Sequence, residues 1–230
     1  MTMTFAALGL APPIVRAVEE RNYIAPTPIQ SAVIPGVLSG RDVWACAHTG
    51  SGKTAAFALP LLQRYSEIGH ETPRRIRSLI LVPTRELAAQ IGASIESYAR
   101  HLPDPVKVAV VFGGVSINPQ MMALRGGADI VVATPGRLLD LVEHNALSLR
   151  SVATVVLDEA DRLLDLGFAD ELSKVLCSLP ERRQNLLFSA TFPPEVNALA
   201  AILLSDPLRV DVASTPGQGS TFTVVLAGTD

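Results

Sequence analysis

Short apolar runs recur along the chain, and stretches with helical spacing lie between them. Within the runs, neighbouring positions are both apolar and often β-branched, which is typical of strands buried on both faces of a parallel sheet. The predicted strands cover 42–47, 77–82, 106–112, 129–133, 153–159, 185–190 and 208–212. The predicted helices cover 53–65, 85–100, 119–124, 136–144, 168–179 and 194–204. The alternation predicts an α/β fold with an open, mostly parallel sheet and helices on both faces.

The length of 230 residues, 48% of them hydrophobic, suits one large α/β domain and is too short for two. We predict that the packed domain covers 1–212. The segment 213–220 (ASTPGQGS) is rich in Gly, Ser, Thr and Pro, which is typical of a linker. The next segment, 221–227 (TFTVVLA), has the composition of an extra strand. Residues 213–230 are therefore assigned to a linker or an atypical tail, of natural or artificial origin.

Several classes of protein are disfavoured by composition. The chain has no apolar run long enough to span a membrane and no signal-peptide pattern at its N-terminus, so we expect a cytoplasmic protein without a membrane partner. Cys46 and Cys177 lie in apolar segments without C-x-x-C spacing, which predicts reduced, packed thiols. The four histidines are too dispersed for a local zinc motif. The net charge of -3 does not by itself suggest nucleic-acid binding.

A glycine-rich segment, AHTGSGKT, follows one predicted strand and opens the next predicted helix, as a P-loop (Walker A) does. Its glycines allow backbone amides to face phosphate oxygens, and Lys53 places a positive charge at the β and γ phosphates. Thr54 offers a hydroxyl to Mg²⁺. The predicted nucleotide-binding loop consists of Ala47, His48, Thr49, Gly50, Ser51, Gly52, Lys53 and Thr54. The alternative is a glycine-rich turn that carries a surface lysine.

Three carboxylates follow another buried strand in the segment VVLDEAD. We expect Asp158 to hold Mg²⁺ through water and Glu159 to accept a proton from the attacking water, so that Lys53, Asp158 and Glu159 form the catalytic set. Asp161 is expected to organise the site. Acidic residues also stabilise a helix N-terminus without any catalytic role, but the glycine-rich segment upstream favours the catalytic interpretation.

These two segments occur together with five shorter ones: PTPIQ (26–30), PTREL (83–87), Gly113–Gly114, TPGR (134–137) and SAT (189–191). In their order and spacing the seven segments resemble the motifs of DEAD-box RNA helicases over roughly 5–212. The resemblance implies the N-terminal RecA-like domain of such an enzyme, with ATP and Mg²⁺ as cofactors. Gln30 and the PTPIQ segment argue against a DNA-acting helicase of the same superfamily.

Adenine recognition is also implied by the resemblance. Gln30 matches the glutamine that reads the adenine edge (the Q motif), and Tyr23 matches the aromatic residue that stacks on the base. Phe5 matches an isolated aromatic residue that supports this region. Two positions depart from the family pattern: Asn22 stands where glycine is usual, and His48 where glutamine is common. Asn22 is expected to tolerate the left-handed backbone that the glycine would adopt.

RNA binding is implied for three further segments of the resemblance. The matching residues are Pro83, Thr84, Arg85, Gly113, Gly114, Thr134, Pro135, Gly136 and Arg137. Helix N-terminal amides, hydroxyls and guanidinium groups suit the sugar-phosphate backbone, so single-stranded or duplex RNA would be bound without sequence preference. The alternative is that these segments only cap helices. Ser189 and Thr191 match the motif that couples nucleotide to RNA, and their hydroxyls are expected to bond the Asp161 carboxylate; a small polar turn is the alternative.

DEAD-box enzymes work as two RecA-like domains, and no second one follows Val212 in this sequence. Because the second domain supplies arginine fingers in that family, we expect this chain alone to hydrolyse ATP poorly and to leave duplexes intact. A competing hypothesis is a truncated, non-catalytic module that binds nucleotide or RNA and acts as a regulator. Nothing in the sequence requires more than a monomer.

Overall fold

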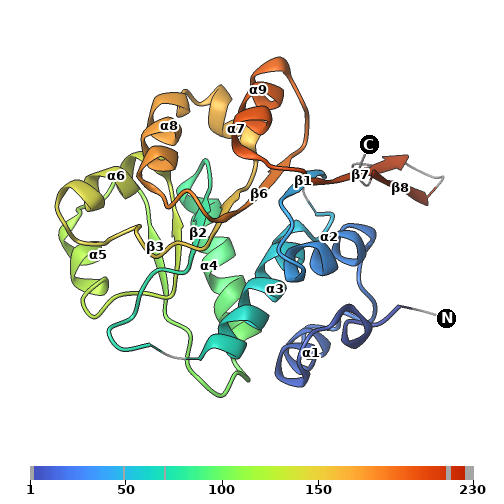
Figure 1. Cartoon of the computed structure of the whole chain (residues 1–230). Helices are drawn as coiled ribbons and strands as arrows, with labels where there is room; N and C mark the ends of the chain where they lie inside the picture. The colour runs from blue at the N-terminus through green and yellow to red at the C-terminus, as the bar shows by residue number, and fades with distance from the viewer. Residues whose placement is uncertain (1–2, 49, 70, 216–218, 226–230) are drawn as a thin grey trace.

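The fold is taken from a computed structural model that describes residues 3–48, 50–69, 71–215 and 219–225, with the backbone alone from 212 onward. Its centre is an eight-stranded sheet with the order β3-β4-β2-β5-β6-β1-β7-β8 (Figure 1). The strands are β1 (Val43–Cys46), β2 (Ser78–Leu81), β3 (Val108–Val111), β4 (Ile130–Ala133), β5 (Thr154–Leu157), β6 (Gln184–Ser189), β7 (Leu208–Thr215) and β8 (Gly219–Val225). Strands β1 to β7 pair in parallel, which confirms the predicted α/β sheet.

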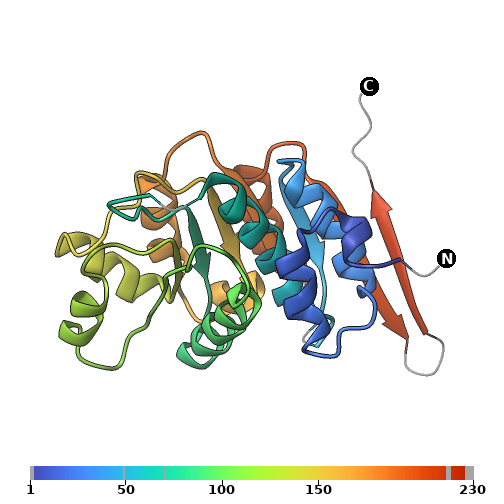
Figure 2. The same ribbon diagram turned by 90° about the horizontal axis from the view of Figure 1, so that it is seen from below.

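Helices cover both faces of this sheet, as predicted (Figures 1 and 2). They are α1 (Pro12–Glu19), α2 (Pro28–Leu38), α3 (Lys53–Ile68), α4 (Arg85–Ala99), α5 (Asn118–Ala123), α6 (Pro135–Glu143), α7 (Ala160–Asp165), α8 (Ala169–Ser178) and α9 (Pro194–Leu203), after the 3-10 turn η1 (Ala6–Leu8). All six predicted helices are present, whereas α1, α2 and α7 were not predicted.

Two hydrophobic layers flank the sheet. One lies between the sheet and helices α1 to α4, and the other between the sheet and helices α6 to α9. Neighbouring residues of one strand enter opposite layers: Ile80 of β2 packs in the first layer, and Leu79 and Leu81 pack in the second. This is why the strand sequences are apolar at consecutive positions.

The end of the chain forms a hairpin. Strand β8 pairs antiparallel with β7, from Arg209 opposite Val225 to Thr215 opposite Gly219, which confirms a strand in the segment predicted for one. The linker prediction for 213–220 was wrong in part, because 213–215 continue β7 and 219–220 begin β8. Backbone hydrogen bonds between β7 and β8 satisfy the N–H and C=O groups of these residues. The small side chains that are typical of a linker do not prevent such bonds. The boundary at 212 stays a prediction.

The two cysteines are free, but only one of them is partly enclosed. Cys46 is half-buried at the end of β1, whereas Cys177 is exposed on α8. The prediction of a packed thiol was therefore wrong for Cys177. Helix α8 buries Leu172 and Val175 against the sheet, and Cys177 lies outside that stripe.

Candidate functional site

Six of the seven predicted site segments, all except PTPIQ, follow the carboxyl ends of parallel strands, so they gather at one edge of the sheet. Along this edge, β3, β4 and β2 are neighbours and lead to the three predicted RNA segments. Strands β5, β6 and β1 are also neighbours and lead to the acidic segment, the SAT segment and the predicted P-loop. The sheet order therefore places the predicted nucleotide half beside the predicted RNA half, with β2 next to β5.

The predicted P-loop has the backbone that its glycines allow. Gly50 and Gly52 have φ values of 86° and 94°, in the left-handed region where glycine carries no steric penalty. Helix α3 begins directly afterwards at Lys53. The buried Ala47 ties the loop to the sheet, because its N–H donates to the carbonyl oxygen of Ser189 at 3.0 Å. His48 is exposed, and Thr49 lies outside the described residues.

Lys53 and Asp158 face each other inside the protein. The Lys53 Nζ lies 3.6 Å from Asp158 Oδ1, and the two side chains are 7% and 3% exposed. At that distance the ammonium group makes no hydrogen bond, and the buried hydroxyl of Ser51 likewise has no partner within the described residues. Burial raises the pKa of Asp158 above its ordinary value, and the attraction of Lys53 only partly opposes this. The two charged groups are thus held close together, and the Lys53 ammonium keeps hydrogen-bond donors that no described residue uses.

Glu159 stands in an unusual backbone conformation directly after β5. Its φ and ψ are both 53°, a left-handed arrangement that is uncommon for a residue other than glycine. Its N–H donates to Asp158 Oδ1 at 3.0 Å, and Arg162 Nη1 lies 3.4 Å from its Oε2. The two carboxylates have different partners: that of Asp158 faces Lys53, and that of Glu159 faces Arg162.

Gln30 is packed against the predicted P-loop. It is 2% exposed, its amide nitrogen donates to the Gly52 carbonyl at 3.1 Å, and its amide oxygen accepts from the Thr27 N–H at 2.9 Å. A Cβ atom on Gly52 would lie 2.5 Å from Gln30 Nε2, so a larger residue at this left-handed position would displace the Gln30 amide. The structure brings Gln30 to the loop as the resemblance implies, with both ends of its amide already bonded.

Tyr23 has different neighbours from Gln30. Its hydroxyl lies 3.4 Å from the hydroxyl of Tyr98 near the end of α4, and the Arg21 guanidinium lies over both rings. Neither Arg21 nor Tyr98 was predicted, since each occupies an ordinary position in its sequence context. Asn22 has φ 59°, which confirms the predicted left-handed turn. Phe5 is buried in the first core layer, as expected of a supporting residue.

The predicted coupling residues form one hydrogen-bond network. The Thr191 hydroxyl and N–H donate to Asp161 Oδ2 at 2.8 and 3.0 Å, as predicted for the hydroxyl. The Ser189 hydroxyl accepts from the Asp161 N–H at 3.2 Å and donates to the Thr191 carbonyl at 2.7 Å, and its hydrogen bonding also helps to lower the pKa of the Asp161 carboxyl. Burial alone would raise the pKa of Asp161. The hydrogen bonds that the Asp161 carboxylate accepts, that from Thr191 first among them, lower this pKa below its ordinary value.

Two of the three predicted RNA segments touch each other. The Gly113 N–H donates to the Thr134 hydroxyl at 3.3 Å, and Arg137 Nη2 donates to the carbonyl of Val115 at 2.8 Å in the same loop. Arg137 is 9% exposed, and its Nη1 has no hydrogen-bond partner within the described residues. Gly114 is exposed and Gly136 half-buried, beside the buried Pro135.

The third predicted RNA segment caps α4. The Thr84 hydroxyl accepts from the Leu87 N–H at 3.2 Å, so the helix-cap interpretation holds for this residue. Pro83 is buried, and Arg85 is exposed beside Glu86, with 2.6 Å between the guanidinium and the carboxylate.

Taken with its site, the fold places the chain among α/β proteins with a RecA-like parallel sheet. None of the helices described is long and apolar enough to cross a membrane. The chain belongs to the DEAD/DEAH box helicase family, whose model matches residues 27–199.

Individual proteins that are similar to this chain support the same family assignment. The chain is 45% identical to "DEAD-box ATP-dependent RNA helicase 28" of Oryza sativa subsp. japonica over 96% of its length, and 48% identical to "ATP-dependent rRNA helicase RRP3" of Pyricularia oryzae over 93%. It spans only 27% and 39% of these relatives. A crystal structure of a DEAD box protein from the hyperthermophile Methanococcus jannaschii matches 91% of this chain with a TM-score of 0.82 and 39% identity, and 56% of that chain is covered.

Proposed function

We propose that this chain is the ATP-binding and single-stranded-RNA-binding half of a DEAD-box RNA helicase. Joined to a second RecA-like domain, it would drive local unwinding or remodelling of RNA. The observation that carries the nucleotide part is the buried Lys53 ammonium, which lies 3.6 Å from Asp158 without a hydrogen-bond partner. A buried charge with unused donors is costly unless a ligand completes its contacts.

ATP with Mg²⁺ fits the groups present. A phosphate oxygen would accept hydrogen bonds from Lys53 and Ser51, both of which are buried and unbonded. Thr54 and Asp158 would hold Mg²⁺, and the charge of that ion favours the ionised carboxylate that burial disfavours. Bound there, Mg²⁺ would neutralise the charge that develops on the phosphates.

The chemical step would use the carboxylates that leave β5. Glu159 would accept a proton from the attacking water. Adenine would accept and donate at the amide of Gln30, so binding ATP requires this amide to exchange its bonds to Gly52 and Thr27. Adenine selectivity and the shape of the predicted P-loop would then depend on one side chain.

The RNA part of the proposal rests on the edge formed by β3, β4 and β2. There Arg137 has an unbonded Nη1, and the amides that begin α4 and α6 face the same edge. Such groups suit phosphates and do not read bases, which supports sequence-independent binding. Asp161 and Thr191 would relay the nucleotide state to this half. We also propose a monomer that acts in the cytoplasm.

The first experiment measures equilibrium binding of fluorescent ADP and ATP in the presence of Mg²⁺. Lys53→Ala should weaken binding by about 10- to 100-fold, because a buried charge-assisted hydrogen bond is lost. Lys174→Ala, which removes an exposed lysine from α8, is the matched control. Gln30→Ala should reduce the preference for ATP over competing GTP.

The result for Lys53→Ala decides whether the nucleotide site is the proposed one. If Lys53→Ala binds nucleotide as tightly as Lys174→Ala, the nucleotide site is elsewhere and the proposal fails. If binding is lost as expected, ATP turnover is measured with RNA and a second RecA-like domain added in trans. Nucleotide binding without any turnover in that mixture would leave a non-catalytic regulatory module.

A further inference from the structure

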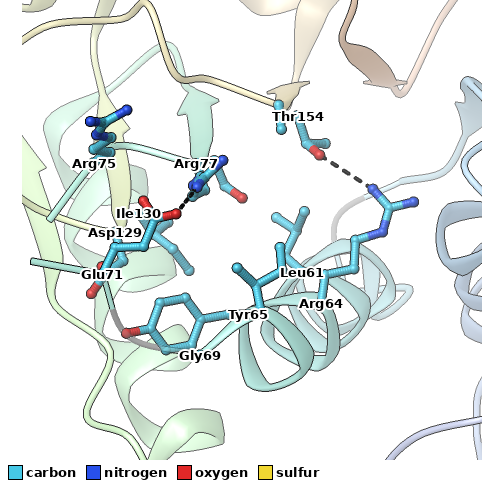
Figure 3. A pocket seen from close by; sticks show the side chains of 13 residues that line it. Leu61, Arg64, Tyr65, Gly69, Glu71, Arg75, Arg77, Asp129, Ile130 and Thr154 are labelled. Carbon is cyan, nitrogen blue, oxygen red and sulfur yellow. Dashed lines mark hydrogen bonds and ion pairs between the residues drawn. The ribbon is translucent and has the colours of Figure 1, made fainter.

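A cavity lies at the opposite edge of the sheet, where β2, β4 and β5 begin (Figure 3). Its volume is about 60 Å³, and one wall is the second half of α3. The walls are apolar where Leu61, Tyr65, Ile68 and Ile130 line it. A space of this size holds about two water-sized groups, so it suits a short apolar tail and not a nucleotide.

One polar side chain of the cavity has no hydrogen-bond partner among the residues described. Ser78, the first residue of β2, is 7% exposed and lines the cavity. Its hydroxyl makes no hydrogen bond within the part of the chain described. The hydroxyl of Ser78 can therefore donate to or accept from a group that enters the cavity.

Four of the charged groups around the cavity are already paired. The Arg77 guanidinium donates to Glu71 across the mouth (Figure 3), and the Arg74 guanidinium donates to Asp129. These two pairs cancel in charge.

Two guanidinium groups at the cavity, those of Arg64 and Arg75, form no salt bridge within the residues described, although the Glu67 carboxylate on α3 attracts that of Arg64. Arg64 donates to the neutral oxygens of Thr154, Gln184 and Val37, and burial lowers its pKa. Arg75 is exposed at the rim and has no partner among the residues described. Three arginines (Arg64, Arg75 and Arg77) and two acidic residues (Glu71 and Asp129) line the cavity, so its lining has one excess positive charge, although the whole chain carries a net charge of -3.

We propose that this cavity binds a small carboxylate with a short apolar tail. The tail packs against Leu61 and Ile130, and the carboxylate accepts from the Ser78 hydroxyl within the field of Arg64 and Arg75. The site is separate from the nucleotide and RNA edge, since it lies at the starts of the strands whose ends carry those residues. It does not depend on the proposed helicase function.

The test is an NMR titration of the 230-residue chain with sodium butyrate, followed at the backbone amides of Ser78, Ile130 and Thr154. Butyrate should give saturable shifts, and acetate should bind roughly tenfold more weakly because two methylene groups are missing. The neutral analogue 1-butanol should bind more weakly than butyrate by a similar factor. Each comparison isolates one half of the ligand.

Variants then locate the site. Ser78→Ala should weaken butyrate about fivefold through the lost hydrogen bond, and Ser78→Val, which fills the chamber, should abolish binding. Arg75→Gln should weaken it severalfold, whereas Arg182→Gln, another exposed arginine outside the cavity, should leave it unchanged. Shifts that do not saturate, that are equal for acetate and butyrate, or that persist in Ser78→Ala would overturn the proposal. Ser78→Ala is small enough to fold even if Ser78→Val does not.

Discussion

The buried carboxyl of Asp158 should make the stability of this domain depend on pH in a defined direction. Its pKa in the folded chain lies above the ordinary 3.8, with burial as the largest cause. The folded chain therefore binds more protons than the unfolded chain between these two values, and the contribution of Asp158 to stability falls as pH rises through that window. Below about pH 3.8 both states are protonated and the penalty disappears.

Asp158→Asn removes this titration and keeps the shape of the side chain. The free energy of unfolding of the variant, minus that of the original chain, should rise with pH and then level off once Asp158 is ionised in the folded state. The rise is about 1.4 kcal/mol for every unit by which the pKa is raised. The difference between the chains cancels the contributions of all other titrating groups.

Lys53→Met is the complementary change. At 3.6 Å the attraction between the two charges is about 4–5 kcal/mol with an effective dielectric constant of roughly 20. Removing it should raise the pKa of Asp158 further, so the stability of this variant should fall more steeply with pH than that of the original chain. The energy of this attraction is the upper limit of the additional loss in the free energy of unfolding.

Urea denaturation from about pH 4 to about pH 8.5 measures these slopes. The chain has a single tryptophan, Trp44 in β1, which serves as an intrinsic fluorescence probe. Asp165→Asn, which removes an exposed carboxylate from the end of α7, is the control. A difference between Asp158→Asn and the original chain that stays flat or falls with rising pH would refute the reasoning.

Two further changes test the loop and the coupling network. Gly52→Ala should lower the melting temperature and weaken nucleotide binding more than Gly50→Ala; both residues have left-handed φ, but only the Cβ on Gly52 meets Gln30, at 2.5 Å. Equal effects in thermal melts and ADP titrations would contradict this. Thr191→Val removes a donor to Asp161, so the pKa of Asp161 should rise and less stability should be lost as pH falls through it. Carboxyl-carbon NMR titration measures that pKa, and an unchanged value would contradict the prediction.

The sequence predicted the sheet because its strands are buried on both faces, which leaves a pattern of consecutive apolar residues. Of the three missed helices, α1 does carry a helical signal, since Ile14, Ala17 and Val18 are buried at helical spacing, whereas α2 and α7 lack one. Helix α2 contains Pro35 in its interior and buries residues around most of its circumference, so no polar face marks it. Helix α7 has only six residues, too few for a helical period.

The site was predictable as a set of segments, because parallel strands end at one edge of a sheet. The particular hydrogen bonds were not. Gln30 reaches Gly52 across 22 positions of sequence, and Ser189 bonds the backbone of Asp161 across 28. The cavity at Ser78 left no trace in the sequence, since α3 and the starts of three strands build it.

The strained and unsatisfied groups of this domain concentrate where the predicted chemistry lies. A left-handed glutamate costs on the order of 1–3 kcal/mol, and the buried Lys53 is held without a hydrogen bond. Both persist because β1 and β5 are paired on both sides within the sheet and their ends cannot relax independently. The fold therefore supplies rigid geometry at a cost in stability, and a ligand that completes these contacts recovers part of that cost as binding energy.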